Sequence, residues 1–227
     1  SLAGLLYFFS QYLQLVRGCS TLQAGLIELP TSLASIAVIA VVAAAVRRLG
    51  NGRALGGGLI LAAAGLLVVA VGESHGGIVV ICIGLLVIGA GVGLAFTVST
   101  GAVLGSVPAD RAGAASAISE TGLELGVALG VAVLGTIQDV GYCLLLGRPP
   151  AGLPDRVVDA AEQSLATLSG VIDQADPGQA RLLGHAQTAF THAMQATAVI
   201  AAGILLVAGV MAARRVPATS ETSEETA

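Results

Sequence analysis

Two glutamates four positions apart, Glu120 and Glu124, interrupt a long apolar stretch of the chain. Side chains at this spacing share one face of a helix, about one turn apart. Two carboxyls this close in an apolar environment do not both ionise easily, so the pair can hold a proton near neutral pH and exchange it for a cation. The alternative is that both lie near a solvated helix end and are merely tolerated there.

Small residues recur beside this pair. Gly122, Gly126 and Gly130 also follow one another every four positions, but they are offset from the glutamates by about 200° around the helix axis. Glycines at this spacing let a neighbouring helix approach closely, so we expect a packing ridge that leaves the glutamates facing a cavity or the centre of a bundle. Gly89 and Gly93 have the same spacing and predict a second helix contact.

Other polar or aromatic side chains within apolar stretches are possible cavity-lining residues: Tyr12, Gln14, His192 and Gln195. His192 either relays protons or makes a hydrogen bond at a helix contact. Tyr12, with Tyr7, Phe8 and Phe9, either stacks on a planar lipophilic cation or packs at an interface. Glu28, two residues before Pro30, either attracts cations at an outer mouth or extends to the membrane surface.

Enzyme and metal chemistry find no support in the sequence. The glycine-rich run 89–93 lies within an uncharged stretch of transmembrane length and has no lysine, so it does not predict a nucleotide site. No nucleophile is spaced with a base as hydrolysis requires, and the three cysteines show neither ligand spacing nor a disulfide pattern. We therefore expect no catalytic residue, no bound metal and no cofactor.

The composition specifies a membrane protein. Of 227 residues, 11% are charged and 55% are hydrophobic, whereas a soluble domain carries about 25% charged residues. The net charge of −4 and the absence of a basic patch exclude nucleic acid as a partner. The hydrophobicity excludes a disordered chain.

Six apolar stretches approach or exceed the roughly 20 residues that a membrane-spanning helix needs. They predict an all-α bundle of six transmembrane helices at 2–16, 22–46, 54–72, 78–103, 112–138 and 186–213. The first is short and looks truncated. The stretches are continuously apolar and do not alternate, which argues against a membrane β-barrel.

The arginines predict the orientation of this bundle. Arg47, Arg48, Arg53 and Arg111 lie in short connections on one side, and Arg214 and Arg215 follow the last helix on the same side. An excess of basic residues in short loops marks the cytoplasmic side, so we expect a multi-pass protein with a cytoplasmic tail.

The sequence thus divides into four parts. Residues 1–138 hold the first five helices, 139–185 form an outer loop with a surface amphipathic helix, 186–213 form the last helix, and 214–227 form a polar, disordered tail. The outer helix is expected because Val158, Ala161, Leu165, Leu168 and Ile172 recur at helical spacing among acids. It serves either as a plain connector or as a lid.

These motifs resemble the 14-helix drug:proton antiporter branch of the major facilitator superfamily. The resemblance is carried by Tyr12–Gly18 with Thr21–Leu26 and Leu29-Pro30, by Arg48-Leu49-Gly50 through Arg53, and by Pro108–Ser116 continuing as Ser119–Gly135. The last stretch is similar to the penultimate helix of exporters of lipophilic and quaternary-ammonium cations, in which acids often occupy the positions matching Glu120 and Glu124.

The resemblance implies the C-terminal half of a major-facilitator fold, in a bacterial inner membrane. It implies proton-coupled efflux of lipophilic or cationic drugs by alternating access, with the proton gradient in place of a cofactor. Its partners are then the N-terminal half of the same transporter, the lipid bilayer and the drugs. Val46 stands where the family often has an aspartate before the arginines. The alternative function is that of a truncated or accessory six-helix membrane protein without transport activity of its own.

Overall fold

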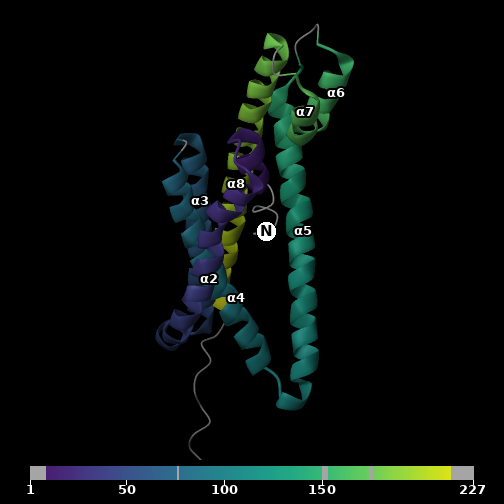
Figure 1. The fold of residues 1–227 in the computed structure, drawn as a ribbon. Coiled ribbons are helices and arrows are strands. Elements are labelled where there is room, and N and C mark those ends of the chain that lie inside the picture. The colour runs from purple at the N-terminus through teal and green to yellow at the C-terminus, as the bar shows by residue number, and fades with distance from the viewer. Residues whose placement is uncertain (1–8, 76, 150–152, 174–175, 216–227) are drawn as a thin grey trace, which may run out of the picture. The chain divides into compact units, whose positions relative to one another are not determined.

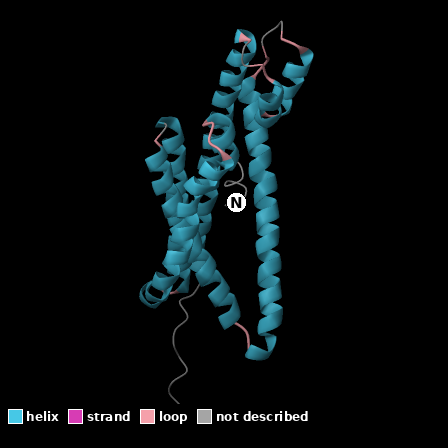
Figure 2. Cartoon of the chain, viewed as in Figure 1, coloured by secondary structure: helices cyan, strands magenta, loops and turns pink. Residues whose placement is uncertain are grey.

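The computed structural model describes residues 9–75, 77–149, 153–173 and 176–215, except for the side chains at 74, 75 and 109. Every element in these ranges is helical, and none is a strand (Figures 1 and 2). In chain order the elements are η1 (Tyr12–Val16), α2 (Thr21–Leu49), α3 (Asn51–His75), α4 (Ile78–Gly105), η2 (Ala109–Arg111), α5 (Ala112–Leu146), α6 (Asp155–Gln163), α7 (Leu165–Val171) and α8 (Pro177–Arg215).

Five of these helices, α2, α3, α4, α5 and α8, are long and apolar enough to cross a membrane. Their outward-facing large side chains are apolar, for example Ile36, which is 66% exposed, and Leu129, which is 65% exposed. Such surfaces suit a lipid environment, in which a helix satisfies its own backbone hydrogen bonds. The expected helical membrane protein is therefore confirmed. Of the first predicted stretch, 2–16, residues 2–8 lie outside the described residues, and η1 covers its last part.

The chain forms two compact units. Unit 1 contains Ser1–Ile27 and Glu124–Ile200, and unit 2 contains Glu28–Leu123 and Ala201–Ala227. Three long helices, α2, α5 and α8, therefore contribute residues to both units.

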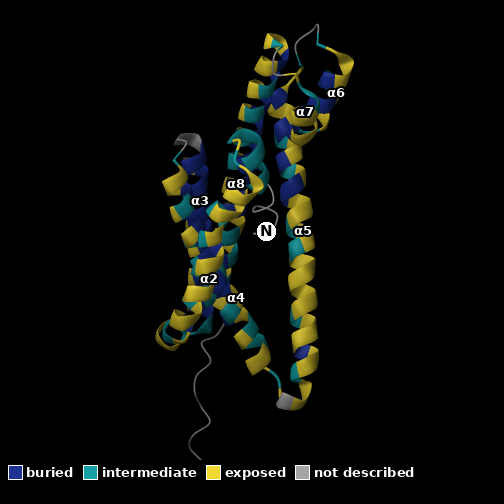
Figure 3. Ribbon diagram, in the orientation of Figure 1, coloured by how far each residue is buried: buried dark blue, intermediate teal, exposed yellow. Residues whose placement is uncertain are grey.

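In unit 2, α3 and α4 pack as an antiparallel pair at glycines on both helices. A Cβ atom on Gly65 would lie 2.7 Å from Ile88 Cγ1, and one on Gly84 would lie 2.6 Å from Val69 Cγ2. No real Cβ atom tolerates such distances, so glycine is what permits this close approach. Figure 3 shows α3 with buried residues through most of its length, in contrast to the largely exposed lower part of α5.

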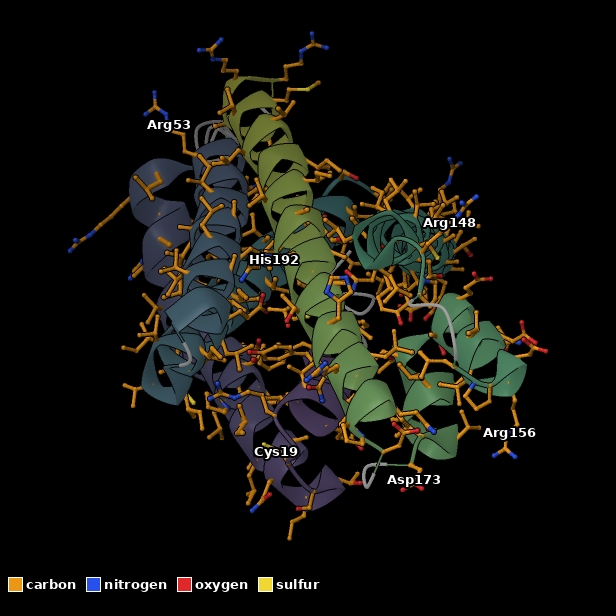
Figure 4. All side chains as sticks on the ribbon, turned by 90° about the horizontal axis from the view of Figure 1, so that it is seen from above. Cys19, Arg53, Arg148, Arg156, Asp173 and His192 are labelled. Atoms are coloured by element: carbon orange, nitrogen blue, oxygen red, sulfur yellow. The ribbon has the colours of Figure 1, made fainter. Side chains whose placement is uncertain are left out.

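The arginines of unit 2 lie at one of its ends. Gly50, in the left-handed conformation with φ of 77°, reverses the chain between α2 and α3. The end of α8 lies beside the start of α3, because a Cβ atom on Gly56 would lie 2.7 Å from Ala213 Cβ. The exposed arginines at this end are Arg47, Arg48, Arg53, Arg111, Arg214 and Arg215. The Arg53 side chain extends away from the helices in Figure 4.

In unit 1, α5 and α8 are joined by a buried polar contact. The Gln138 side chain is 1% exposed; its Nε2 donates to the Phe190 carbonyl at 3.3 Å, and its Oε1 accepts from Thr197 Oγ1 at 3.3 Å. Gly141 lies against Ala193 one turn further along. Polar side chains facing between membrane helices usually hydrogen-bond to the neighbouring helix in this way.

The segment between α5 and α8 is shorter than expected from the sequence. Helix α5 continues past position 138 to Leu146, and α8 begins at Pro177 instead of near 186. The α8 extension, 177–185, contains several polar residues, whereas α5 continues through Asp139 into the mainly apolar residues 140–146. The tail expected to be disordered, 214–227, lies outside the described residues from position 216 onward.

The amphipathic helix expected in this segment is two helices, α6 and α7. Ser164 separates them with an extended backbone, and its Oγ accepts a hydrogen bond from the Thr167 N–H at 3.1 Å. A serine in this conformation caps the following helix and ends the preceding one. The pair packs on α5 through the Tyr142 hydroxyl, which donates to the Ala161 carbonyl at 2.9 Å.

Candidate functional site

An open hollow of about 320 Å³ lies between the C-terminal part of α4 and the N-terminal part of α5. It belongs entirely to unit 2. Its lining comes from Phe96, Ser99, Thr100 and Leu104 in α4 and from Ser116, Ser119, Glu120, Gly122 and Leu123 in α5. Glu120, the first of the two glutamates singled out in the sequence, is its only carboxylate side chain.

Helical geometry places these residues on facing surfaces. Ser116, Ser119, Glu120 and Leu123 follow the spacing i, i+3, i+4, i+7 and therefore form one stripe of α5. Residues 107–111 connect the two helices, so the polar end of α4 and the start of α5 stay close together. The serines of this stripe were not predicted as site residues from the sequence, although their spacing from Glu120 is visible there.

The lining suits a cation that has an apolar body. Glu120 supplies the negative charge, and four hydroxyl groups supply hydrogen-bond donors and acceptors. Phe96 adds an aromatic face, which attracts cations, while Leu104 and Leu123 add apolar contact area. Glu120 is exposed, so the hollow is open to a ligand in this conformation.

Glu124 lies one turn further along α5 and is also exposed. It is not part of the lining of the hollow. The two carboxyls therefore have different surroundings, although their spacing in the sequence predicted an equivalent pair. Whether they act together stays a prediction.

The predicted glycine contacts differ between the two helices. In α4, Gly89 and Gly93 lie against α2: a Cβ atom on Gly89 would overlap the Thr31 carbonyl, and one on Gly93 would lie 2.7 Å from the Ser35 carbonyl oxygen. In α5, a Cβ atom on Gly122 or Gly126 would meet no atom within 4 Å among the described residues.

Gly122 and Gly126 thus have no packing partner in the part of the chain that the structure describes, and Gly122 lines the hollow, while packing at Gly130 stays a prediction. Gly130 belongs to the same helix and is half-buried. Spacing reveals which residues share a face of a helix, but not whether another helix lies against that face.

Two further acids of unit 2 lie in helices. Glu28 in α2 is half-buried, and Glu73 in α3 is only 5% exposed. Among the residues that the structure describes, Glu28 Oε1 and both carboxyl oxygens of Glu73 have no hydrogen-bond partner. Glu73 was not predicted as a site residue, because the sequence around it was interpreted as a short outer loop. The helix continues through it to His75 because no proline or unfavourable turn interrupts it before the glycines at 76 and 77.

The remaining candidates lie in unit 1. Tyr12 is buried and stacks on Phe9 with ring centroids 6.1 Å apart, whereas Tyr7 and Phe8 lie outside the described residues. The Gln14 side chain donates to the Ser10 carbonyl at 3.3 Å.

His192 in α8 is exposed, and its Nδ1 lies 3.3 Å from Gln195 Oε1 one turn further along the helix (Figure 4). This contact lies within α8, so both roles considered for His192, a proton relay or a helix-contact histidine, stay predictions. Among the described residues no group of three or more histidine, cysteine or acidic side chains is arranged to hold a metal ion.

Comparison with known proteins gives the context for this site. No protein-family model matches the chain. It is 39% identical over 209 residues to the multidrug efflux pump LfrA of Mycolicibacterium smegmatis, and the aligned residues cover 91% of this chain and 41% of that protein. It is 29% identical over 191 residues to the methyl viologen resistance protein SmvA of Salmonella typhimurium, and the aligned residues cover 84% of this chain and 38% of that protein.

A third relative is the tetracenomycin C resistance and export protein of Streptomyces glaucescens, 27% identical over 221 residues that cover 93% of this chain and 41% of the relative. The chain thus spans about two fifths of the length of the curated relatives that it matches. These relatives are named as pumps, export proteins or resistance proteins, and none is named as an enzyme. The chain is a multi-pass membrane protein whose relatives include proteins named for drug efflux and drug resistance.

Proposed function

We propose that the chain is the C-terminal half of a proton-coupled transporter that exports lipophilic or cationic drugs by alternating access, in the 14-helix branch of the major facilitator superfamily. The observation that carries this proposal is the hollow of unit 2, in which one carboxylate, Glu120, lies among hydroxyl and apolar side chains. A relative named for resistance to methyl viologen, a dication, supports cations as substrates.

In the proposed cycle, Glu120 and Glu124 bind the cation when they are deprotonated and release it when they are protonated from the opposite side. A cation and a proton then compete for the same carboxyls, and this competition couples the two fluxes. The energy comes from the proton gradient, so no cofactor is required. The partners are the N-terminal half of the same transporter and the surrounding lipid.

The test uses the protein encoded by the whole reading frame, reconstituted in lipid vesicles with an imposed pH gradient. Changing both Glu120→Gln and Glu124→Gln should lower proton-driven transport of methyl viologen at least about tenfold, because neither side chain can then alternate between charged and neutral forms. The matched control is Glu162→Gln, an exposed acid of α6 outside the membrane-spanning helices, which should transport normally. Undiminished transport in the double variant would overturn the coupling role of this pair.

We further propose that the arginine end of unit 2 faces the cytoplasm of a bacterial inner membrane. The support is the excess of arginine in its short connections. In a cysteine-free background, a cysteine at Asn51 should resist an impermeant maleimide added to intact cells, and one at Gly170 should react. The reverse pattern would invert the orientation.

A further inference from the structure

Glu73 is the acid whose surroundings are least compatible with a charge. It lies near the end of α3, with 5% of its surface exposed, and within the described part of the chain neither of its carboxyl oxygens has a hydrogen-bond partner. Glu120 and Glu124, in contrast, are both exposed. A buried carboxylate is normally paired, hydrogen-bonded or bound to a cation, and Glu73 has no hydrogen-bond partner among the described residues.

Its neighbours on α3 are apolar. Leu66, Val69 and Ala70 precede it by one or two turns on the same face of the helix, and all three are buried. At this level α3 also lies close to α4, because a Cβ atom on the adjacent Gly72 would lie 2.8 Å from Ile81 Cγ1. The residues that precede Glu73 on this face of α3 therefore offer its carboxyl no polar side chain.

Apart from His75, whose side chain lies outside the described part of the structure, the charged groups of unit 2 are remote from Glu73 or are acids like it. Helix α4, which packs against α3, contains no charged residue, and its only titratable side chain is the half-buried Cys82. The acid of α2, Glu28, has an unpartnered oxygen of its own. The arginines lie at the other end of α3, where Arg53 is about 30 Å from Glu73 along the helix axis. The sequence places His75 two positions after Glu73.

We propose that Glu73 is a second proton-binding carboxyl, separate from the Glu120 hollow, at the end of unit 2 opposite the arginines. In this conformation it holds a proton and is uncharged. When this end of α3 becomes hydrated during transport, the proton passes from the carboxyl oxygen to water, and it returns when the site closes. The coupling role rests on the proposed transport function, whereas the protonated state of Glu73 does not.

The protonated state is tested by infrared spectroscopy of the whole protein in lipid at neutral pH. A protonated carboxyl has a carbonyl stretch distinct from that of a carboxylate, and this band should be present in the wild type and lost in Glu73→Gln. The matched control Glu28→Gln should retain the band. A wild-type spectrum without a protonated carboxyl, or a band that persists in Glu73→Gln, would overturn the proposal.

The coupling role is tested by transport of methyl viologen in vesicles. Glu73→Gln, which is always neutral and nearly isosteric, should lower proton-driven transport at least about tenfold but leave exchange without a pH gradient within about twofold. Glu73→Asp, which keeps a titratable carboxyl, should restore proton-driven transport in part. Normal coupled transport by Glu73→Gln would refute this role. If the wild type transports no methyl viologen, the proposed function fails, while the infrared result still decides the state of Glu73.

Discussion

The hydroxyl of Ser35 in α2 lies 2.9 Å from the carbonyl oxygen of Gly89 in α4, a residue 54 positions further along the chain. The same hydroxyl lies 2.9 Å from the Thr31 carbonyl of its own helix, so one donor is shared between two acceptors. This contact is possible only because Gly89 has no side chain to separate the two backbones. The pair therefore fixes the position of α2 against α4 within unit 2.

Replacing Gly89 with alanine should destabilise this contact, because the added Cβ atom would overlap the Thr31 carbonyl. We expect a loss of about 1–3 kcal/mol in the free energy of unfolding, the usual effect of overpacking. The measurement is the unfolding transition of the purified protein in detergent. Gly101→Ala is the control in the same helix, since no atom lies within 4 Å of its added Cβ atom, and it should unfold like the wild type. Equal stability of the two variants would contradict the close approach.

In unit 1, Gln138 and Thr197 should be coupled energetically. The Thr197 hydroxyl lies 3.3 Å from Gln138 Oε1 and 2.9 Å from the Ala193 carbonyl, so its single proton is shared. A double-mutant cycle with Gln138→Leu and Thr197→Val should give a coupling energy of about 0.6 kcal/mol, typical of hydrogen bonds between membrane helices. Additive effects of the two substitutions, measured by unfolding in mixed detergent micelles, would exclude the interaction.

The start of α8 should loosen at acid pH. Asp176 precedes Pro177 at the first helical position, and its Oδ1 accepts a hydrogen bond from the Gly178 N–H at 2.7 Å. This bond, with a further bond to Oδ2 from the Gln179 side-chain amide at 3.1 Å, lowers the pKa of Asp176 below its usual range. Because the pKa is lowered on folding, the stabilisation is present above the ordinary aspartate value of about 3.9 and is lost as the pH falls through the folded value.

Amide hydrogen exchange measures this effect. At neutral pH, Asp176→Ala should weaken protection of the first turn of α8 relative to the wild type, and the difference should vanish in acid. Asp159→Ala, which removes an exposed acid of α6, should leave that turn unchanged. Protection that does not differ between wild type and Asp176→Ala at neutral pH would show that the cap contributes nothing.

The two glutamates of α5 should not be equivalent. Glu120 lines the hollow and Glu124 does not, so Glu120→Gln should raise the KM for methyl viologen by about tenfold, equivalent to roughly 1.4 kcal/mol of lost binding. Glu124→Gln should change the KM less and should act mainly on the pH dependence of transport. Kinetics of the two single variants over a range of pH test this difference. A larger KM effect for Glu124→Gln would place the binding site elsewhere.

Hydropathy and residue spacing determined which segments of this chain are membrane helices and which residues share a helix face. Ser116, Ser119 and Glu120 form a stripe because of their positions in the sequence, and any α-helix would align them. The helix ends were less predictable, since α5 continues through Asp139 to Leu146 and α8 begins in the polar residues that precede its apolar stretch.

Only the tertiary structure decided what lies against each face. Gly89 meets a neighbouring helix and Gly122 meets none in the described part of the chain, although both belong to the same kind of pattern. Glu73 reads as a loop residue in the sequence and is buried in the fold, whereas Glu120 is in an apolar stretch and is exposed. The physical reason is that burial depends on contacts between segments distant in the chain, and periodicity within one helix contains no information about its neighbours.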